Sequence, residues 1–289
     1  MMEKVLAFAL SGGGSRGALQ LGAMYALLEH GLQPDLLTGA SIGAANAAFL
    51  AVNGFTKDSL DHLAEIWRTA SAANIMPSNY VWLTVRAMFG RSSNDPSRVL
   101  REFLIAHGFS PDLRFSDLKH ARLVIISADL NTGKPILHGE ILDEKVLDAL
   151  LLSTALPPWF MPVRNQNRYL MDGAVLSHLP VEPALKLGAT EIVAFDLIDP
   201  REAQAEGDGL RGFLGRLVYS VEKRQSDLEL ELAEARGVPV LYLALAGYAP
   251  THVWDFQHTD ELIARGYEIA QGAIESQRLS NPILAGRGE

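Results

Sequence analysis

Short apolar runs bounded by glycine or turn residues alternate with longer amphipathic segments along this 289-residue chain. The amphipathic segments carry apolar residues at helical spacing, whereas the short runs are typical of buried strands. Alternation of this kind builds a mostly parallel sheet that is covered by helices on both faces. The sequence therefore predicts an α/β fold of three layers, with the sheet between two layers of helices.

The expected elements can be assigned to residue ranges. Strands are expected at 5–10, 36–39, 123–128, 169–171, 191–195 and 238–243. Helices are expected at 17–30, 42–53, 57–70, 96–107, 144–152, 181–187, 209–235 and 259–277. Because proline has no N–H to donate to a sheet, Pro135 predicts that residues 134–139 form an edge hairpin.

Composition predicts a single domain over residues 1–289. Hydrophobic residues make up 48% of the chain and charged residues 20%, as in globular proteins with a sizeable core. The motifs that carry chemistry lie within 5–196, and 197–289 is expected to complete the same α/β domain. Residues 71–94 have no clean period and are expected to form a lid-like insertion.

Charge and cysteine content exclude several classes of function. The formal net charge of -9 argues against a general electrostatic grip on nucleic acid or anionic lipid headgroups. The chain has no cysteine, which excludes disulfides and thiolate chemistry. No H-x-x-x-H, H-E-x-x-H or calcium-loop spacing occurs, so neither a metal nor a cofactor is expected.

No targeting or membrane-spanning segment is predicted. The apolar run at 5–10 is too short for a signal-peptide core, and no later run approaches ~18 apolar residues. We therefore expect a cytoplasmic location, with any membrane contact peripheral, local and apolar.

A glycine-rich loop follows the first expected strand. Residues 11–17 read Ser-Gly-Gly-Gly-Ser-Arg-Gly and lead into a helix, so their backbone N–H groups can cradle an anion. Gly12, Gly14 and Gly17 also satisfy the G-x-G-x-x-G pattern of dinucleotide-binding loops. Such a loop needs an acidic residue at the end of the next strand, whereas Asp35 lies before that strand.

The second expected strand ends in a G-x-S-x-G motif. Gly39 and Gly43 flank Ser41, and a helix-like segment follows. This spacing is typical of a nucleophile elbow, in which a sharp strand-to-helix turn exposes a strained serine. The alternative is an ordinary helix N-cap.

A candidate base follows the short expected strand at 169–171. Asp172 precedes Gly173, a dipeptide that by itself more often marks a turn. A carboxylate with an ordinary pKa near ~3.9 is a poor base for a serine hydroxyl, so we expect Asp172 to be partly buried and its pKa raised.

Together these segments resemble the patatin-like phospholipases. That family combines a G-G-G-x-R-G loop, a G-x-S-x-G elbow and a D-G-[AG] segment, which here are residues 12–17, 39–43 and 172–174. Residues 153–162 also resemble the S-x-A-x-P-x-x-F-x-P stretch that precedes the aspartate. The resemblance covers about 5–196 and implies a patatin-like three-layer fold.

The resemblance implies a Ser-Asp dyad that cleaves carboxylic esters of lipids, as a phospholipase A, lysophospholipase or esterase. Ser41 would be the nucleophile and Asp172 its base. The implied oxyanion donors are the backbone N–H groups of Gly12, Gly13, Gly14 and Ser15. The implied supporting residues are Arg16, Gly39, Gly43 and Gly173. His178 departs from the pattern, because many relatives carry asparagine there.

Several alternatives stay open. His252 follows Ser41 and Asp172 in the chain order of an α/β-hydrolase triad, and His178 could also serve Ser41. A nucleotide-binding module, an acyltransferase and a catalytically idle scaffold are compatible with the same motifs.

Access for lipid is expected near the catalytic region. An apolar mouth could be formed by Tyr80, Trp82, Met88, Phe89, Trp159 and Phe160. The expected helix at 209–235 carries many charges of both signs, so we expect a solvated face there.

Overall fold

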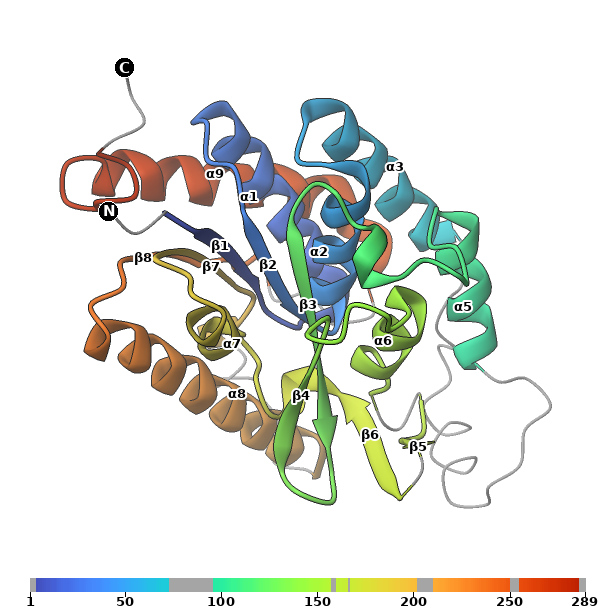
Figure 1. The fold of residues 1–289 in the computed structure, drawn as a ribbon. Helices are drawn as coiled ribbons and strands as arrows, with labels where there is room; N and C mark the ends of the chain where they lie inside the picture. Colours follow the sequence, from blue (N-terminus) through green and yellow to red (C-terminus); the bar gives the residue numbers. More distant parts are fainter. Residues whose placement is uncertain are drawn as a thin grey trace.

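A computed structural model describes residues 4–72, 96–156, 160–165, 167–201, 210–249 and 255–285. Its centre is an eight-stranded sheet with the strand order β5-β6-β3-β2-β1-β7-β8, and β4 also pairs with β3 (Figure 1). The strands are β1 (Leu6–Leu10), β2 (Leu36–Ala40), β3 (Arg122–Asp129), β4 (Lys134–His138), β5 (Val163–Asn165), β6 (Arg168–Asp172), β7 (Glu191–Asp196) and β8 (Val240–Ala244).

The sheet is parallel in the middle and antiparallel at one side. β1 pairs in parallel with β2 and β7, β2 with β3, and β7 with β8. β4 and β6 run antiparallel to β3, and β5 runs antiparallel to β6. Because β1 and β2 are parallel neighbours, their carboxyl ends, each followed by a glycine-containing motif, meet at one edge of the sheet.

Helices cover both faces of the sheet, as Figure 1 shows. One layer contains α1 (Gly17–Glu29), α2 (Ile42–Asn53), α3 (Lys57–Ala72), α5 (Pro96–Ala106), α6 (Val146–Ser153) and α9 (Thr259–Gln277). The other layer contains α7 (Val181–Lys186) and α8 (Leu210–Ala235). Short 3-10 turns occur at Gly14–Arg16, Phe115–Asp117, Gly173–Val175 and Phe256–His258.

The alternation of side chains along β1 builds both cores. Leu6, Phe8 and Leu10 point into the larger core, whereas Ala7 and Ala9 face the layer of α7 and α8. All five residues are fully buried, as expected for a central parallel strand.

The predicted fold class is confirmed, and the predicted bounds differ from the observed ones by two residues or fewer. The hairpin expected around Pro135 is confirmed as β3 and β4. The short strand β5 was not predicted. The lid-like insertion lies almost entirely outside the described residues. No helix in the described ranges is long and apolar enough to cross a membrane.

The first half of α8 exposes large apolar side chains that its charges did not suggest. Phe213, Leu217, Val218 and Val221 are 57%, 48%, 53% and 46% exposed, so this end of the helix presents large apolar side chains outward. The charged residues that suggested a solvated helix lie mostly after Val221.

Candidate active site

Ser41 occupies a sharp turn between β2 and α2. Its φ of 55° and ψ of -126° make it the one non-glycine residue with positive φ in the described part of the chain. Such a backbone conformation is strained for an L-residue and is characteristic of functional sites. The turn also places Ser41 at the N-terminus of α2, where the helix dipole favours negative charge.

The glycines on either side of Ser41 are required by close backbone approach. A Cβ on Gly43 would lie 2.3 Å from the Leu10 carbonyl oxygen, and one on Gly39 would lie 2.6 Å from the Ala44 nitrogen. Any larger residue would force the turn apart. The G-x-S-x-G spacing therefore has a local steric reason here.

Asp172 meets Ser41 although the two are 131 residues apart. It ends β6, and it pairs with Ser127 of β3 directly after the point where Ala40 of β2 pairs with Ile126. The ends of β2 and β6 therefore meet on the same side of β3, and β4 pairs with the other side. The Ser41 hydroxyl donates to Asp172 Oδ2 at 2.6 Å, and the Ala174 N–H donates to Oδ1 at 2.9 Å. The serine hydroxyl is thus hydrogen-bonded directly to a carboxylate.

Burial makes the Asp172 carboxyl group less acidic than that of an exposed aspartate. Asp172 is 1% exposed, and desolvation raises its pKa to about 7 despite the opposing hydrogen bonds from Ser41 and Ala174. Its ionised form is therefore a much stronger base than an exposed aspartate.

The segment after α6 ties both members of this pair in place. Ser153 Oγ accepts a hydrogen bond from the Ser41 N–H at 3.0 Å. Two residues later, the Ala155 carbonyl accepts one from the Asp172 N–H at 3.0 Å. This contact gives a physical role to the S-x-A part of the stretch noted in the sequence.

The glycine loop lies against Ser41. A Cβ on Gly12 would lie 2.6 Å from the Ala174 Cβ and 3.3 Å from the Ser41 Cβ, so only glycine fits without displacing a neighbour. The Gly12 N–H donates to the His178 carbonyl at 3.2 Å. This N–H group is therefore not available to a bound ligand.

The backbone N–H groups of the next two residues of the loop have no acceptor within the described residues. Neither Gly13 nor Gly14 donates its N–H to an acceptor within the described residues, and Gly14 lines the cavity beside Ser41. Ser15 is buried in the following turn. Arg16 is also buried, and its Nε donates to the Gly13 carbonyl at 3.3 Å, which braces the loop.

Gly173 packs as tightly as the elbow glycines. A Cβ at this position would lie 2.1 Å from the Ile126 carbonyl oxygen in β3. The close approach lets the chain turn directly after Asp172 without leaving the sheet.

The His178 side chain lies near two carboxylates other than Asp172. Its Nε2 is 3.7 Å from Asp196 Oδ1, and its Nδ1 is 3.7 Å from Glu222 Oε1. Burial lowers its pKa. In the part of the chain that the structure describes, no histidine side chain bonds to Asp172. His252 lies outside the described residues.

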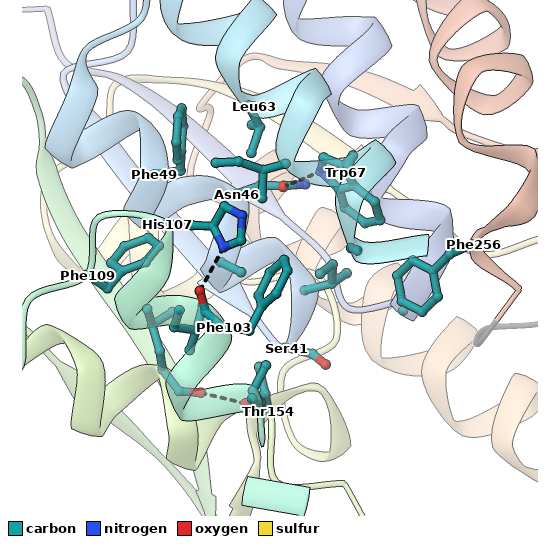
Figure 2. A pocket seen from close by; sticks show the side chains of 18 of the residues that line it. Ser41, Asn46, Phe49, Leu63, Trp67, Phe103, His107, Phe109, Thr154 and Phe256 are labelled. Atoms are coloured by element: carbon teal, nitrogen blue, oxygen red, sulfur yellow. Dashed lines mark hydrogen bonds between the residues drawn. The ribbon is translucent and has the colours of Figure 1, made fainter. Parts of the chain in front are cut away.

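An apolar cavity of about 130 Å³ opens beside Ser41 (Figure 2). Side chains from α2, α3, α5 and α6 form most of its wall. Phe160, from the expected mouth, and Phe256, which was not expected, also line it. Tyr80, Trp82, Met88, Phe89 and Trp159 lie outside the described residues.

Comparison with known proteins identifies the family. The model of the family described as patatin-like phospholipase matches residues 8–185 of this chain. The chain belongs to that family. The matched range includes both Ser41 and Asp172 and ends at the last turn of α7.

Individual relatives of this patatin-like chain are distant and much longer. Lysophospholipase NTE1 of Meyerozyma guilliermondii is 25% identical over 321 residues, covering 100% of this chain and 21% of that protein. Human patatin-like phospholipase domain-containing protein 6 is 28% identical over 211 residues, covering 72% of this chain and 14% of that protein. The patatin-like chain thus spans about a fifth or less of these relatives.

A solved structure supports the fold of the patatin-like chain. Human GIVD cytosolic phospholipase A2 superposes with a TM-score of 0.54 at 12% identity, covering 95% of this chain and 59% of that chain. At this identity the likeness concerns the fold alone.

Proposed function

We propose that this protein hydrolyses carboxylic ester bonds of lipids through a Ser41–Asp172 dyad. The observation that carries the proposal is the 2.6 Å hydrogen bond between a strained serine and a buried carboxylate whose pKa is raised to about 7. A carboxylate of that basicity can take the serine proton near neutral pH without a histidine.

The reaction begins with attack of Ser41 Oγ on the ester carbonyl while Asp172 accepts its proton. The tetrahedral intermediate collapses to an acyl-enzyme, and the protonated Asp172 gives its proton to the leaving alcohol. Asp172 then deprotonates a water molecule that attacks the acyl-enzyme. The second tetrahedral intermediate collapses by breaking the bond to Ser41 Oγ, which takes the proton back from Asp172, and the carboxylic acid leaves. The same residue acts as base and acid in turn.

We assign the oxyanion to the N–H groups of Gly13 and Gly14. These donors are free within the described residues and lie in the loop that contacts Ser41. Gly12 allows the loop to approach, since its own N–H serves the His178 carbonyl. One preorganised donor is typically worth roughly 3 kcal/mol of transition-state stabilisation.

The nucleotide-binding alternative has less support. Asp35, the acidic residue nearest the expected ribose position, accepts a hydrogen bond from the Leu6 N–H at 2.8 Å. That contact lies at the start of β1, the opposite end of the strand from the glycine loop. The cavity beside the loop is also apolar, which suits an acyl chain better than a nucleotide.

Labelling with a fluorophosphonate followed by peptide mass spectrometry tests the proposed nucleophile. We expect the label on Ser41 and none on Ser41→Ala. A labelled serine elsewhere, or an unreactive wild-type protein that binds nucleotide, would overturn the proposal. Competition of an added alcohol with water for the acyl group separates hydrolysis from acyl transfer.

We further propose that the first half of α8 contacts lipid surfaces. Phe213, Leu217 and Val221 recur at intervals of four residues, so they share one face of the helix, and all are exposed. Because α8 connects the parallel strands β7 and β8, its first residues lie at the carboxyl edge of the sheet, where Ser41 also lies. Gln225 binds the Val175 carbonyl at 2.6 Å, next to the turn after Asp172.

A further inference from the structure

We infer that the cavity beside Ser41 accepts one acyl chain of medium length, about eight to ten carbons, and that Phe49 sets this limit. The inference rests on the proposed function and adds the class of acyl group. The observation that supports it is that the cavity follows a single face of α2.

Three positions of that face mark the course of the cavity. Ser41, Ala45 and Phe49 are four residues apart, and all three line the cavity. Ser41 and Ala45 are partly exposed, whereas Phe49 is 1% exposed. The cavity therefore runs inward along α2 from the nucleophile and becomes closed at Phe49.

Other buried side chains complete the closed end. Leu63, Leu104 and Phe109 are 4%, 6% and 4% exposed and line the same cavity. The Phe49 ring also packs edge-on against the His62 ring at 5.4 Å. Figure 2 shows Phe49 and Phe109 on the side of the cavity away from Ser41. Within the described residues, these side chains form a wall behind which the core is packed.

The spacing along α2 gives the length. Eight residues at about 1.5 Å each place Phe49 roughly 12 Å beyond Ser41. An extended chain advances about 1.2 Å per bond, so roughly ten bonds fit in this distance. Helical side chains lean toward the helix N-terminus, so the Phe49 ring shortens the usable length by about one or two bonds.

The polar atoms in the wall favour an acyl chain over a headgroup. Asn46 Nδ2 donates to the Gly17 carbonyl and to Gln20, and Asn46 Oδ1 accepts from the Trp67 indole at 3.1 Å. His107 Nδ1 is bonded to the Phe103 carbonyl at 2.7 Å. Because these groups are used within the protein, they hold the wall together, and the remaining surface is apolar.

The test is the dependence of kcat/KM on chain length with p-nitrophenyl esters of four to sixteen carbons. For the wild type we expect kcat/KM to rise about fourfold per methylene up to eight to ten carbons and to fall beyond that length. Ala45→Phe should block the cavity one turn from Ser41 and lower the decanoate-to-butyrate ratio of kcat/KM at least tenfold. Phe49→Ala should move the optimum to twelve carbons or more.

Phe55→Ala is the matched control. Phe55 is a buried phenylalanine that packs edge-on against Phe8 and lies outside the cavity wall, so it tests general loosening of the core. Its optimum should stay at the wild-type length. If Phe49→Ala does not fold, Ala45→Phe still decides. Turnover with one unchanged optimum in both cavity variants overturns the inference alone, whereas a wild type inert on every ester overturns the proposed function and the inference with it.

Discussion

Ser41 and Asp172 are held by backbone contacts as much as by their own hydrogen bond. The Ser41 N–H and the Asp172 N–H both donate to the segment Ser153–Ala155, which follows α6. A strained backbone conformation such as that of Ser41 persists only where several surrounding contacts hold it in place. We therefore expect Ser153 to act as a positioning residue for Ser41, the proposed nucleophile.

Ser153→Ala should lower kcat about tenfold, because loss of one buried hydrogen bond costs about 1 to 2 kcal/mol and lets Ser41 drift. KM should change little, since Ser153 does not line the cavity. Steady-state kinetics measure both constants. Ser153→Thr keeps the hydroxyl and should recover most of the loss. Ser59→Ala removes another buried, hydrogen-bonded serine and should leave kcat unchanged. Equal losses in the alanine and threonine variants would contradict the positioning role.

The ionised form of Asp172 should destabilise the folded protein. Its pKa is raised from 3.8 to about 7 in the folded protein, so the folded state holds the proton more tightly than the unfolded state. The stabilisation from this proton is complete below pH ~3.8 and is lost as the pH rises through about 7. Asp172→Asn removes this dependence.

The free energy of unfolding of Asp172→Asn minus that of the wild type should therefore increase by about 2 to 3 kcal/mol between pH 5 and pH 8.5. Urea unfolding at both pH values measures this difference. A difference that is the same at both pH values would mean that the carboxylate is not buried in the way described.

At the scale of elements, α1 and α9 pack backbone to backbone. A Cβ on Gly22 would lie 1.9 Å from the Ile263 carbonyl oxygen, and one on Gly266 would lie 2.0 Å from the Leu19 carbonyl oxygen. Neither carbonyl can move without displacing its helix. This contact fixes α9 against the layer that carries α2.

Gly266→Ala should therefore destabilise the protein by about 3 kcal/mol or more, because the helices must separate. Gly272→Ala is a matched control in the same helix, where the added Cβ meets nothing within 4 Å. It should stabilise the protein by up to about 1 kcal/mol, as alanine is the better helix former. Thermal or urea unfolding measures both changes, and a tolerated Gly266→Ala would refute the close packing.

The exposed apolar face of α8 has its own test. Replacing Phe213 and Leu217 by serine should weaken binding to phosphatidylcholine vesicles by roughly a hundredfold, since two large side chains no longer insert. Vesicle sedimentation gives the bound fraction. Leu228→Ser changes a side chain of similar exposure in the second half of α8 and should leave binding unaltered. Binding that is insensitive to the double substitution would exclude this surface.

At the scale of the whole molecule, local patterns predicted most elements but not how they meet. The glycines around Ser41 and after Asp172 have local steric roles, so their motifs could be read from the sequence. The pairing of Ser127 with Asp172, and the bond from Ser153 to Ser41, join residues far apart in sequence and depend on tertiary packing. No local signal specifies such contacts.

The other features that the sequence did not predict have particular physical causes. β5 was missed because it is three residues long, fully exposed and without alternation of polar and apolar residues. The apolar end of α8 was not foreseen because its charges were counted over the whole helix, whereas most of the exposed apolar side chains gather at one end. Most of the cavity wall could not be predicted, because it is formed by four helices together with side chains from several separate loops.

The most direct test of the Ser41–Asp172 dyad is hydrolysis of a p-nitrophenyl ester by the wild type, Ser41→Ala, Asp172→Asn and His252→Ala, each confirmed to be folded. If Asp172 is the base, the first two variants should lose at least about a thousandfold in kcat, and His252→Ala should keep turnover of the wild-type order. An equally inactive His252→Ala, or an Asp172→Asn that retains activity, would contradict the dyad and point to a Ser-Asp-His triad or to another base.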